Sequence, residues 1–138
     1  SNNNIKIIEE NKYHEILILN NTPYSSIDLH ENKSLLLENN FENLNAIDWE
    51  KGCYVGQEIT ARMKYRALLK KKLYPLKIRK GKASIDMELI SNGKKIGEIK
   101  SIANSYILAI LNIEFVDELK KITNILKLDD ALMLEFLN

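Results

Sequence analysis

The chain has 138 residues, of which 45% are hydrophobic and 28% are charged, and its formal net charge is +1. This composition is typical of a soluble globular domain. No apolar run approaches the roughly 18–20 residues of a membrane span, so no membrane partner is expected. The single cysteine excludes an internal disulfide and a cysteine-rich metal site. His14 and His30 are remote from each other, so no bound metal is expected, and the predicted location is cytoplasmic, in the cytosol or an organelle matrix derived from it.

The first third of the chain is predicted to hold short apolar segments separated by turns. Residues 15–19 form a β-like run, and residues 20–23, Asn-Asn-Thr-Pro, follow as a turn. Residues 35–37 are a second short apolar run. Residues 41–49 are predicted to form a helical turn or loop with three apolar side chains on one side, Phe41, Leu44 and Ile47.

The most informative segment is KGCYVGQE, residues 51–58, which contains the only cysteine, Cys53. Residues 57–66 favour a helix, because Ile59 and Met63 lie one turn apart and an acidic residue stands in the first turn. The local pattern therefore predicts the end of a strand, a glycine turn and the start of a helix.

Two interpretations of Cys53 follow from this pattern. Gly52 and Gly56 can adopt a positive φ or allow another group to approach closely. The free N–H groups of the following helix and the charge of Lys51 both favour a thiolate, which predicts a reactive thiol. The alternative is a buried cysteine that packs as a small hydrophobic residue.

The charged residues are unevenly distributed. Glu58 and Arg62 are four residues apart, which predicts a helix-surface ion pair worth only ~0.2–0.5 kcal/mol. Residues 64–82 hold nine basic residues and no acidic one. This stripe could attract a polyanion, but LLKKKLYPLKIRKGK also alternates as a strand with its lysines in water, and lysine on an exposed edge discourages aggregation. No interleaved aromatic residues accompany it, so no nucleic-acid partner is expected.

The second half of the chain is predicted to be a series of short strands. These are placed at residues 72–79, 84–91, 94–102, 106–112 and 131–137, with a helical excursion at residues 115–123. Ser91-Asn92-Gly93-Lys94 predicts a tight hairpin turn. Short strands at this spacing suggest a small antiparallel barrel from residue 68 onward.

The motif resembles the signature of the YgfZ family, folate-binding relatives of the glycine-cleavage T-protein that support iron–sulfur enzymes. That signature is K-G-C-[FY]-x-G-Q-E-x-x-x-R, and every specified position is met, by Lys51, Gly52, Cys53, Tyr54, Gly56, Gln57, Glu58 and Arg62. Residues 35–50, including Trp49, and residues 92–111 also look like the corresponding parts of that family.

The resemblance implies an α+β fold, in which a partial T-protein-like α/β segment precedes a small antiparallel C-terminal β-barrel. Residues 1–67 would be the C-terminal part of a folate-binding, T-protein-like domain, and residues 68–138 would be the barrel. Members of this family are usually longer, with a larger folate-site domain ahead of this region. The chain is therefore identified as the C-terminal half of such a protein.

The implied function is an auxiliary role in the assembly or repair of iron–sulfur enzymes rather than a classical enzymatic activity, with a link to tRNA modification. Tetrahydrofolate or a related folate would bind the intact protein, and iron–sulfur enzymes or assembly proteins would be its partners. Cys53 would be the chemical centre, as a thiolate that transiently touches a cluster or its donor, or as a redox-sensitive contact point. Lys51 would hold the charge of the thiolate, and Gly52 and Gly56 would keep the approach open. The loop and helix would be held in place by Gln57, Glu58 and Arg62. Tyr54 would be a packing residue rather than a chemical one.

Two other functions are weighed against this one. The first is tetrahydrofolate-dependent aminomethyl transfer, because T-proteins resemble the chain in outline. However, T-proteins carry R-L-E-A-G-x-P where this chain has residues 17–23, so that Leu17 replaces the arginine and Leu19 the glutamate at the pterin. A leucine can neither accept a pterin hydrogen bond nor transfer a proton. The second alternative is a purely structural barrel module, and the intact signature argues against it.

Overall fold

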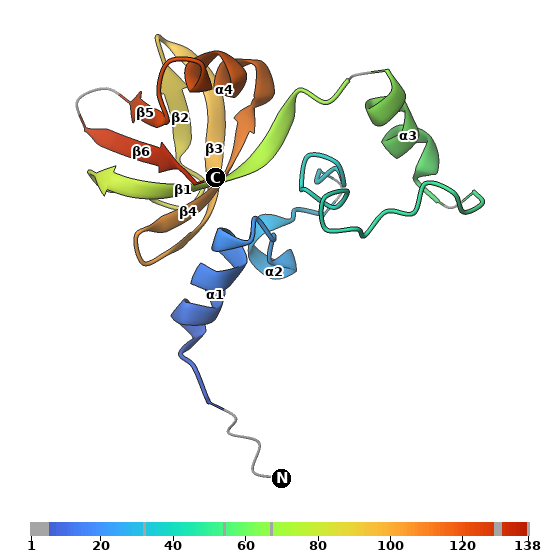
Figure 1. Ribbon diagram of the computed structural model, residues 1–138, viewed down its shortest axis with the longest axis horizontal. Helices are drawn as coiled ribbons and strands as arrows, with labels where there is room; N and C mark the ends of the chain where they lie inside the picture. The colour runs from blue at the N-terminus through green and yellow to red at the C-terminus, as the bar shows by residue number, and fades with distance from the viewer. Residues whose placement is uncertain (1–5, 32, 54, 67, 129–130, 138) are drawn as a thin grey trace.

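A computed structural model describes residues 6–31, 33–53, 55–66, 68–128 and 131–137 (Figure 1). In chain order its elements are α1 (Glu10–Leu19), α2 (Ser25–Asp28), α3 (Gln57–Tyr65), β1 (Lys71–Lys80), β2 (Glu88–Ser91), β3 (Lys94–Ala103), β4 (Tyr106–Asn112), α4 (Ile113–Lys120), β5 (Ile125–Leu128) and β6 (Leu132–Phe136). In Figure 1 the strands wrap into one body, and α3 is set off from it at the end of extended connections.

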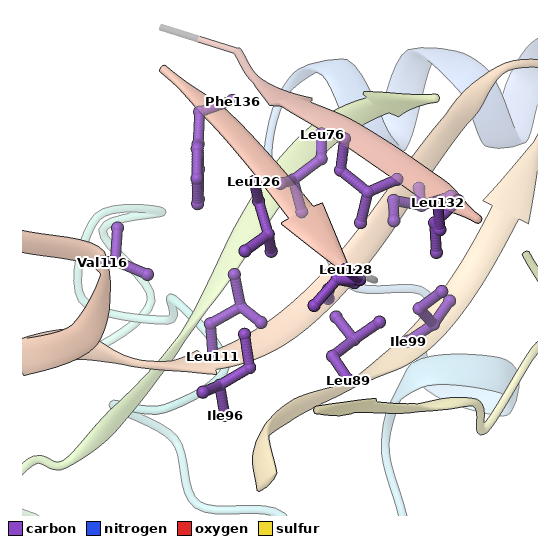
Figure 2. Close-up of a cluster of buried hydrophobic side chains, with 13 residues drawn as sticks. Leu76, Leu89, Ile96, Ile99, Leu111, Val116, Leu126, Leu128, Leu132 and Phe136 are labelled. Carbon is purple, nitrogen blue, oxygen red and sulfur yellow. The ribbon is translucent and has the colours of Figure 1, made fainter. Parts of the chain in front are cut away.

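The six strands form one antiparallel sheet that curls into a nearly closed barrel. The strand order is β2-β3-β4-β1-β6-β5, and the two edge strands, β2 and β5, approach each other at the seam. Leucine and isoleucine side chains from all six strands fill the interior, and α4 adds Val116 to the same core (Figure 2). Burying a side chain of this size contributes about 1.5–3 kcal/mol, so this core is the main source of stability. The predicted C-terminal antiparallel barrel is confirmed.

The hairpin turn between β2 and β3 has the predicted conformation. Asn92 has φ 50° and Gly93 has φ 72°, and the flanking residues Ser91 and Lys94 are paired. Two successive positive φ values are the signature of a type I′ turn, whose twist matches that of the strands it connects. An Asn-Gly pair adopts this conformation at low cost, which is why the sequence signal was reliable here.

The β-like run predicted at residues 15–19 is wrong, because these residues form the last turns of helix α1. Ile18 is buried against the outer face of the barrel, in a second core cluster with Leu73, Leu108 and Ile110. The helix ends at Leu19 and is capped by Asn20, whose side-chain Nδ2 donates to the carbonyl of Ile16 (2.8 Å). A short apolar run does not distinguish a strand from the end of a buried helix, and here tertiary packing decided for the helix.

Three further differences concern the strands. The strand predicted at residues 84–91 is confined to β2, because a turn with Asp86 at φ 61° precedes it. The four-residue strand β5 was not predicted. The exposed edge suggested for the lysine-rich strand is also wrong, since β1 pairs with both β4 and β6 and lies inside the sheet.

The segment that precedes the barrel is attached to the free side of β1. Strand β6 pairs with β1 only from Leu76 onward, and the N–H of Leu73 instead donates to the carbonyl of Glu38 (3.0 Å). The carbonyl of Leu73 accepts from Asn21 Nδ2 (3.2 Å), and Asn40 Nδ2 donates to the carbonyl of Asn21 (2.8 Å). The described part of residues 6–66 contains helices and turns but no strand, so the T-protein-like α/β character of this segment is not confirmed. The division at residues 67 and 68 stays a prediction.

Candidate functional site

Cys53 lies in the loop that leads into α3, and its side chain is exposed to solvent. The packing alternative for this cysteine therefore does not hold in this structure. Gly56 caps the helix with φ 88° and ψ −4°, the left-handed conformation that favours glycine. The predicted glycine turn and the helix start at Gln57 are both confirmed, whereas the strand end predicted ahead of them is wrong, because residues 46–53 form bends and irregular backbone. Tyr54 lies outside the described residues.

Helix α3 is anchored to the segment before the motif. Thr60 and Met63 are its buried residues, and the Thr60 hydroxyl donates to the carbonyl of Gly56 (3.3 Å). Lys64 pairs with Glu42 (2.5 Å), and its Nζ lies 4.0 Å from the centroid of the Trp49 ring. A cation above a tryptophan ring is stabilised by the charge distribution of the ring, by about 0.5–1 kcal/mol at an exposed site. These contacts fix the helix, and with it the position of the Cys53 loop, against residues 42–49.

The two apolar residues whose spacing predicted helix α3 differ in exposure. Ile59 is 58% exposed, while Met63, one turn later, is buried. Lys64 contacts Glu42 and Trp49, whereas Ile59 points to solvent. Val55, four residues before Ile59, is fully exposed and was not singled out from the sequence. Both apolar side chains lie within six residues of the exposed thiol in the chain. Their only sequence signal is their place inside the motif.

The motif side chains are only partly brought together. Glu58 and Arg62 form the predicted ion pair, with side chains that are 74% and 57% exposed. Neither of them, nor Lys51 or Gln57, has a recorded hydrogen bond or ion pair with Cys53 within the described part of the chain. The proposed roles of Lys51, Gly52, Gln57, Glu58 and Arg62 toward Cys53 thus stay predictions.

The described residues also bear on metal and membrane sites. Among them, no three His, Cys, Asp or Glu side chains gather in a group that could hold a metal ion. None of the helices in this part of the chain is long and apolar enough to cross a bilayer.

Comparison with known proteins gives one consistent group of relatives. The chain is 39% identical over 66 residues to an iron-sulfur cluster assembly factor IBA57 homolog, mitochondrial, of Neurospora crassa. It is 30% identical over 104 residues to the human iron-sulfur cluster assembly factor IBA57, mitochondrial, and 48% identical over 40 residues to the homolog of Dictyostelium discoideum. No family model matches the chain. The chain is thus similar to iron–sulfur cluster assembly factors named IBA57, and the YgfZ name expected from the motif is a coarser label than the one these relatives carry.

The alignments cover a small part of each relative. They include 48% of this chain and 15% of the Neurospora protein, and 72% of this chain and 29% of the human protein. The names of these relatives also overturn one prediction: all of them are mitochondrial, which contradicts the cytoplasmic location. Neither folate nor tRNA modification is mentioned in their names.

Proposed function

We propose that this chain is part of a protein that supports the assembly or repair of iron–sulfur clusters in mitochondria, with Cys53 as its chemical centre. The similarity to IBA57 factors supports the process and the compartment. The observation that supports the site is the exposed Cys53 thiol, which stands in a loop shaped by the left-handed Gly56. A thiol in such a loop is accessible to a cluster carried by another protein.

The number of ligands determines how Cys53 would act. Iron–sulfur clusters are normally held by four protein ligands, most often cysteines, and this chain has one cysteine. A cluster that meets Cys53 would therefore be a cargo shared with a partner protein, which supplies the remaining ligands. The alternative role is that of a redox-sensitive contact point, in which oxidation of the thiol controls the meeting with the partner. The exposed Val55 and Ile59 would belong to the contact surface in both cases.

Folate binding is proposed for the intact protein by resemblance alone. At the end of α1, Leu17 and Leu19 occupy the places of the pterin-binding arginine and glutamate of T-proteins, and 43% of the Leu19 surface is exposed. These aliphatic side chains offer no hydrogen bond, so the residues of this chain do not fit a pterin there. Aminomethyl transfer has no structural observation in its favour, and no step of the proposed function involves folate.

The test is a complementation experiment in cells that lack their own factor of this type. The full-length product of the gene is expressed with Cys53 or with Cys53→Ser, and the activities of iron–sulfur enzymes are compared with those of cluster-free enzymes. We expect Cys53→Ser to lose the support of iron–sulfur enzymes at unchanged protein level, since serine at an exposed position leaves folding intact.

The matched control moves the thiol to another exposed position. The double variant Cys53→Ser, Ser105→Cys has the same number of thiols, and its new cysteine lies in the turn between β3 and β4, far along the chain from the motif. We expect it to remain inactive. Full support by Cys53→Ser would refute the role of the thiol and favour the structural barrel module.

A further inference from the structure

A second candidate site lies on the outer face of the barrel, away from the Cys53 loop in the sequence. It is a cavity of about 180 Å³ between residues 30, 33–34 and 38–39 on one side and the strands β1, β3 and β4 on the other. Its charged and titratable lining side chains come from both parts of the chain: His30, Lys33, Glu38, Lys71, Glu98 and Lys100. The hydrogen bond from the N–H of Leu73 to the carbonyl of Glu38 holds the two walls together.

The inner wall carries an ion pair between the buried Lys100 and Glu98, whose side chain is 31% exposed. The pairing of β3 with β4 shifts between Ile99 and Ser101, and Lys100 lies at this irregularity with only 7% of its side chain exposed. Its Nζ donates to Glu98 (2.5 Å), which also accepts from Lys95 (3.2 Å). The hydrogen bond from Lys100 is the main reason why the pKa of Glu98 is lowered, so this carboxylate stays ionised. The charge of Glu98 is therefore already matched by its two lysine partners.

The remaining charges of the cavity are not matched in this way. Lys33 and Lys71 have no recorded ion pair within the described part of the chain, and neither does Glu38. Burial raises the pKa of Glu38, an effect that the charges of Lys71 and Lys100 only partly offset. The cavity is thus lined by three lysines and two carboxylates. Of the two carboxylates, Glu38 is the one more easily neutralised by a proton.

We propose that this cavity binds a small oxyanion of the carboxylate or phosphate class, with Lys33 and Lys71 as its cationic contacts. Two lysine ammonium groups provide point charges and several N–H donors for such an anion, in a cavity closed on one side by the barrel. The volume of about 180 Å³ suits a small ion rather than a segment of a protein. Nothing in the Cys53 loop takes part, so this site is independent of the proposed iron–sulfur role.

The protonation of Glu38 couples this binding to pH. An ionised Glu38 repels an anion, whereas a protonated Glu38 can donate a hydrogen bond to it. The other groups that face Glu38 are His30 and Lys33 from its own segment, Lys71 from β1, and the Glu98–Lys100 pair from β3. The oxyanion therefore binds more tightly as the pH falls.

Calorimetric titration of the folded chain with inorganic phosphate and with malonate tests the proposal. We expect saturable binding of at least one probe in the millimolar range, and the preferred probe identifies the anion class. Lys71→Gln should weaken binding by about tenfold, which corresponds to about 1.4 kcal/mol. The matched control is Lys72→Gln, the next residue of β1, which does not line the cavity because successive strand residues point to opposite faces.

Two results would overturn the proposal. The first is the absence of saturable binding of both probes, and the second is an equal weakening by Lys71→Gln and Lys72→Gln, which indicates diffuse attraction to a basic surface. The pH arm uses sulfate, because this anion does not change its charge in the range studied. Binding of sulfate should be tighter at about pH 5 than at about pH 8, and Glu38→Gln should reduce this difference.

Discussion

Replacement of Gly56 by alanine tests the turn on which the Cys53 loop depends. With φ at 88°, an L-residue at this position pays a left-handed penalty of about 1–2 kcal/mol. A Cβ atom built on Gly56 meets no heavy atom within 4 Å, so no clash adds to that cost. Alanine offsets part of this cost by about 0.4–1 kcal/mol, because it restricts the unfolded chain more than glycine does. The expected net loss is about 1 kcal/mol, and Gly56→Asn should lose less because asparagine tolerates this region and caps helices well.

The assay should report on α3 itself, because the helix is set off from the barrel and can open without global unfolding. Amide hydrogen exchange of residues 57–65 is expected to become about fivefold faster in Gly56→Ala, since 1 kcal/mol corresponds to that factor. Gly52→Ala is the matched control: its Cβ also meets nothing within 4 Å, and its φ is outside the left-handed region. Equal effects of the two substitutions, or unchanged exchange in α3, would refute the reasoning.

Three further predictions concern single substitutions. Glu58→Ala should reduce the free energy of unfolding by only ~0.2–0.5 kcal/mol, because its partner Arg62 is exposed; a loss of several kcal/mol in urea titration would contradict this. Gly97→Ala should cost about 3 kcal/mol in the same assay, because its Cβ would lie 2.1 Å from the carbonyl oxygen of Ile110; wild-type stability would show that the barrel relaxes freely. Burial raises the pKa of Glu38, so the folded chain binds this proton more tightly than the unfolded chain, and the resulting stability is lost as the pH rises through the raised pKa. The free energy of unfolding of Glu38→Gln should therefore rise relative to that of the wild type between about pH 4 and about pH 7 in anion-free buffer. If the difference between the two stays constant or falls over this range, the prediction is wrong.

The barrel was predictable where local signals agree with the tertiary structure. The Asn92-Gly93 turn fixes a hairpin by its own backbone preferences, and β1, β3 and β4 are long enough to show their apolar pattern. Strand β5 has only four residues, too few for a pattern to stand out. The helical state of residues 15–19 depends on the contact of Ile18 with the barrel, which no local signal reports.

The candidate site was predicted in outline. The left-handed Gly56 and the helix start follow from glycine chemistry and helix patterning, which act locally. The exposed face of α3 did not follow, because it depends on how Trp49 and Glu42 meet Lys64 across the loop. The oxyanion cavity was not predicted at all, since it joins residues 30, 33–34 and 38–39 to strands that come much later in the chain.

The position of β1 inside the sheet has a consequence for the order of folding. Strands β2, β3 and β4 are joined by short turns and can pair as soon as they are made, whereas β1 pairs with β4 and with the last strand, β6. During synthesis β1 therefore emerges first and waits as an unpaired strand for partners on both sides. Five of its ten residues are basic, and Pro75 interrupts its row of N–H donors. Positive charge and proline hinder pairing with other chains, so the lysine-rich stripe protects the nascent strand until the barrel closes around it.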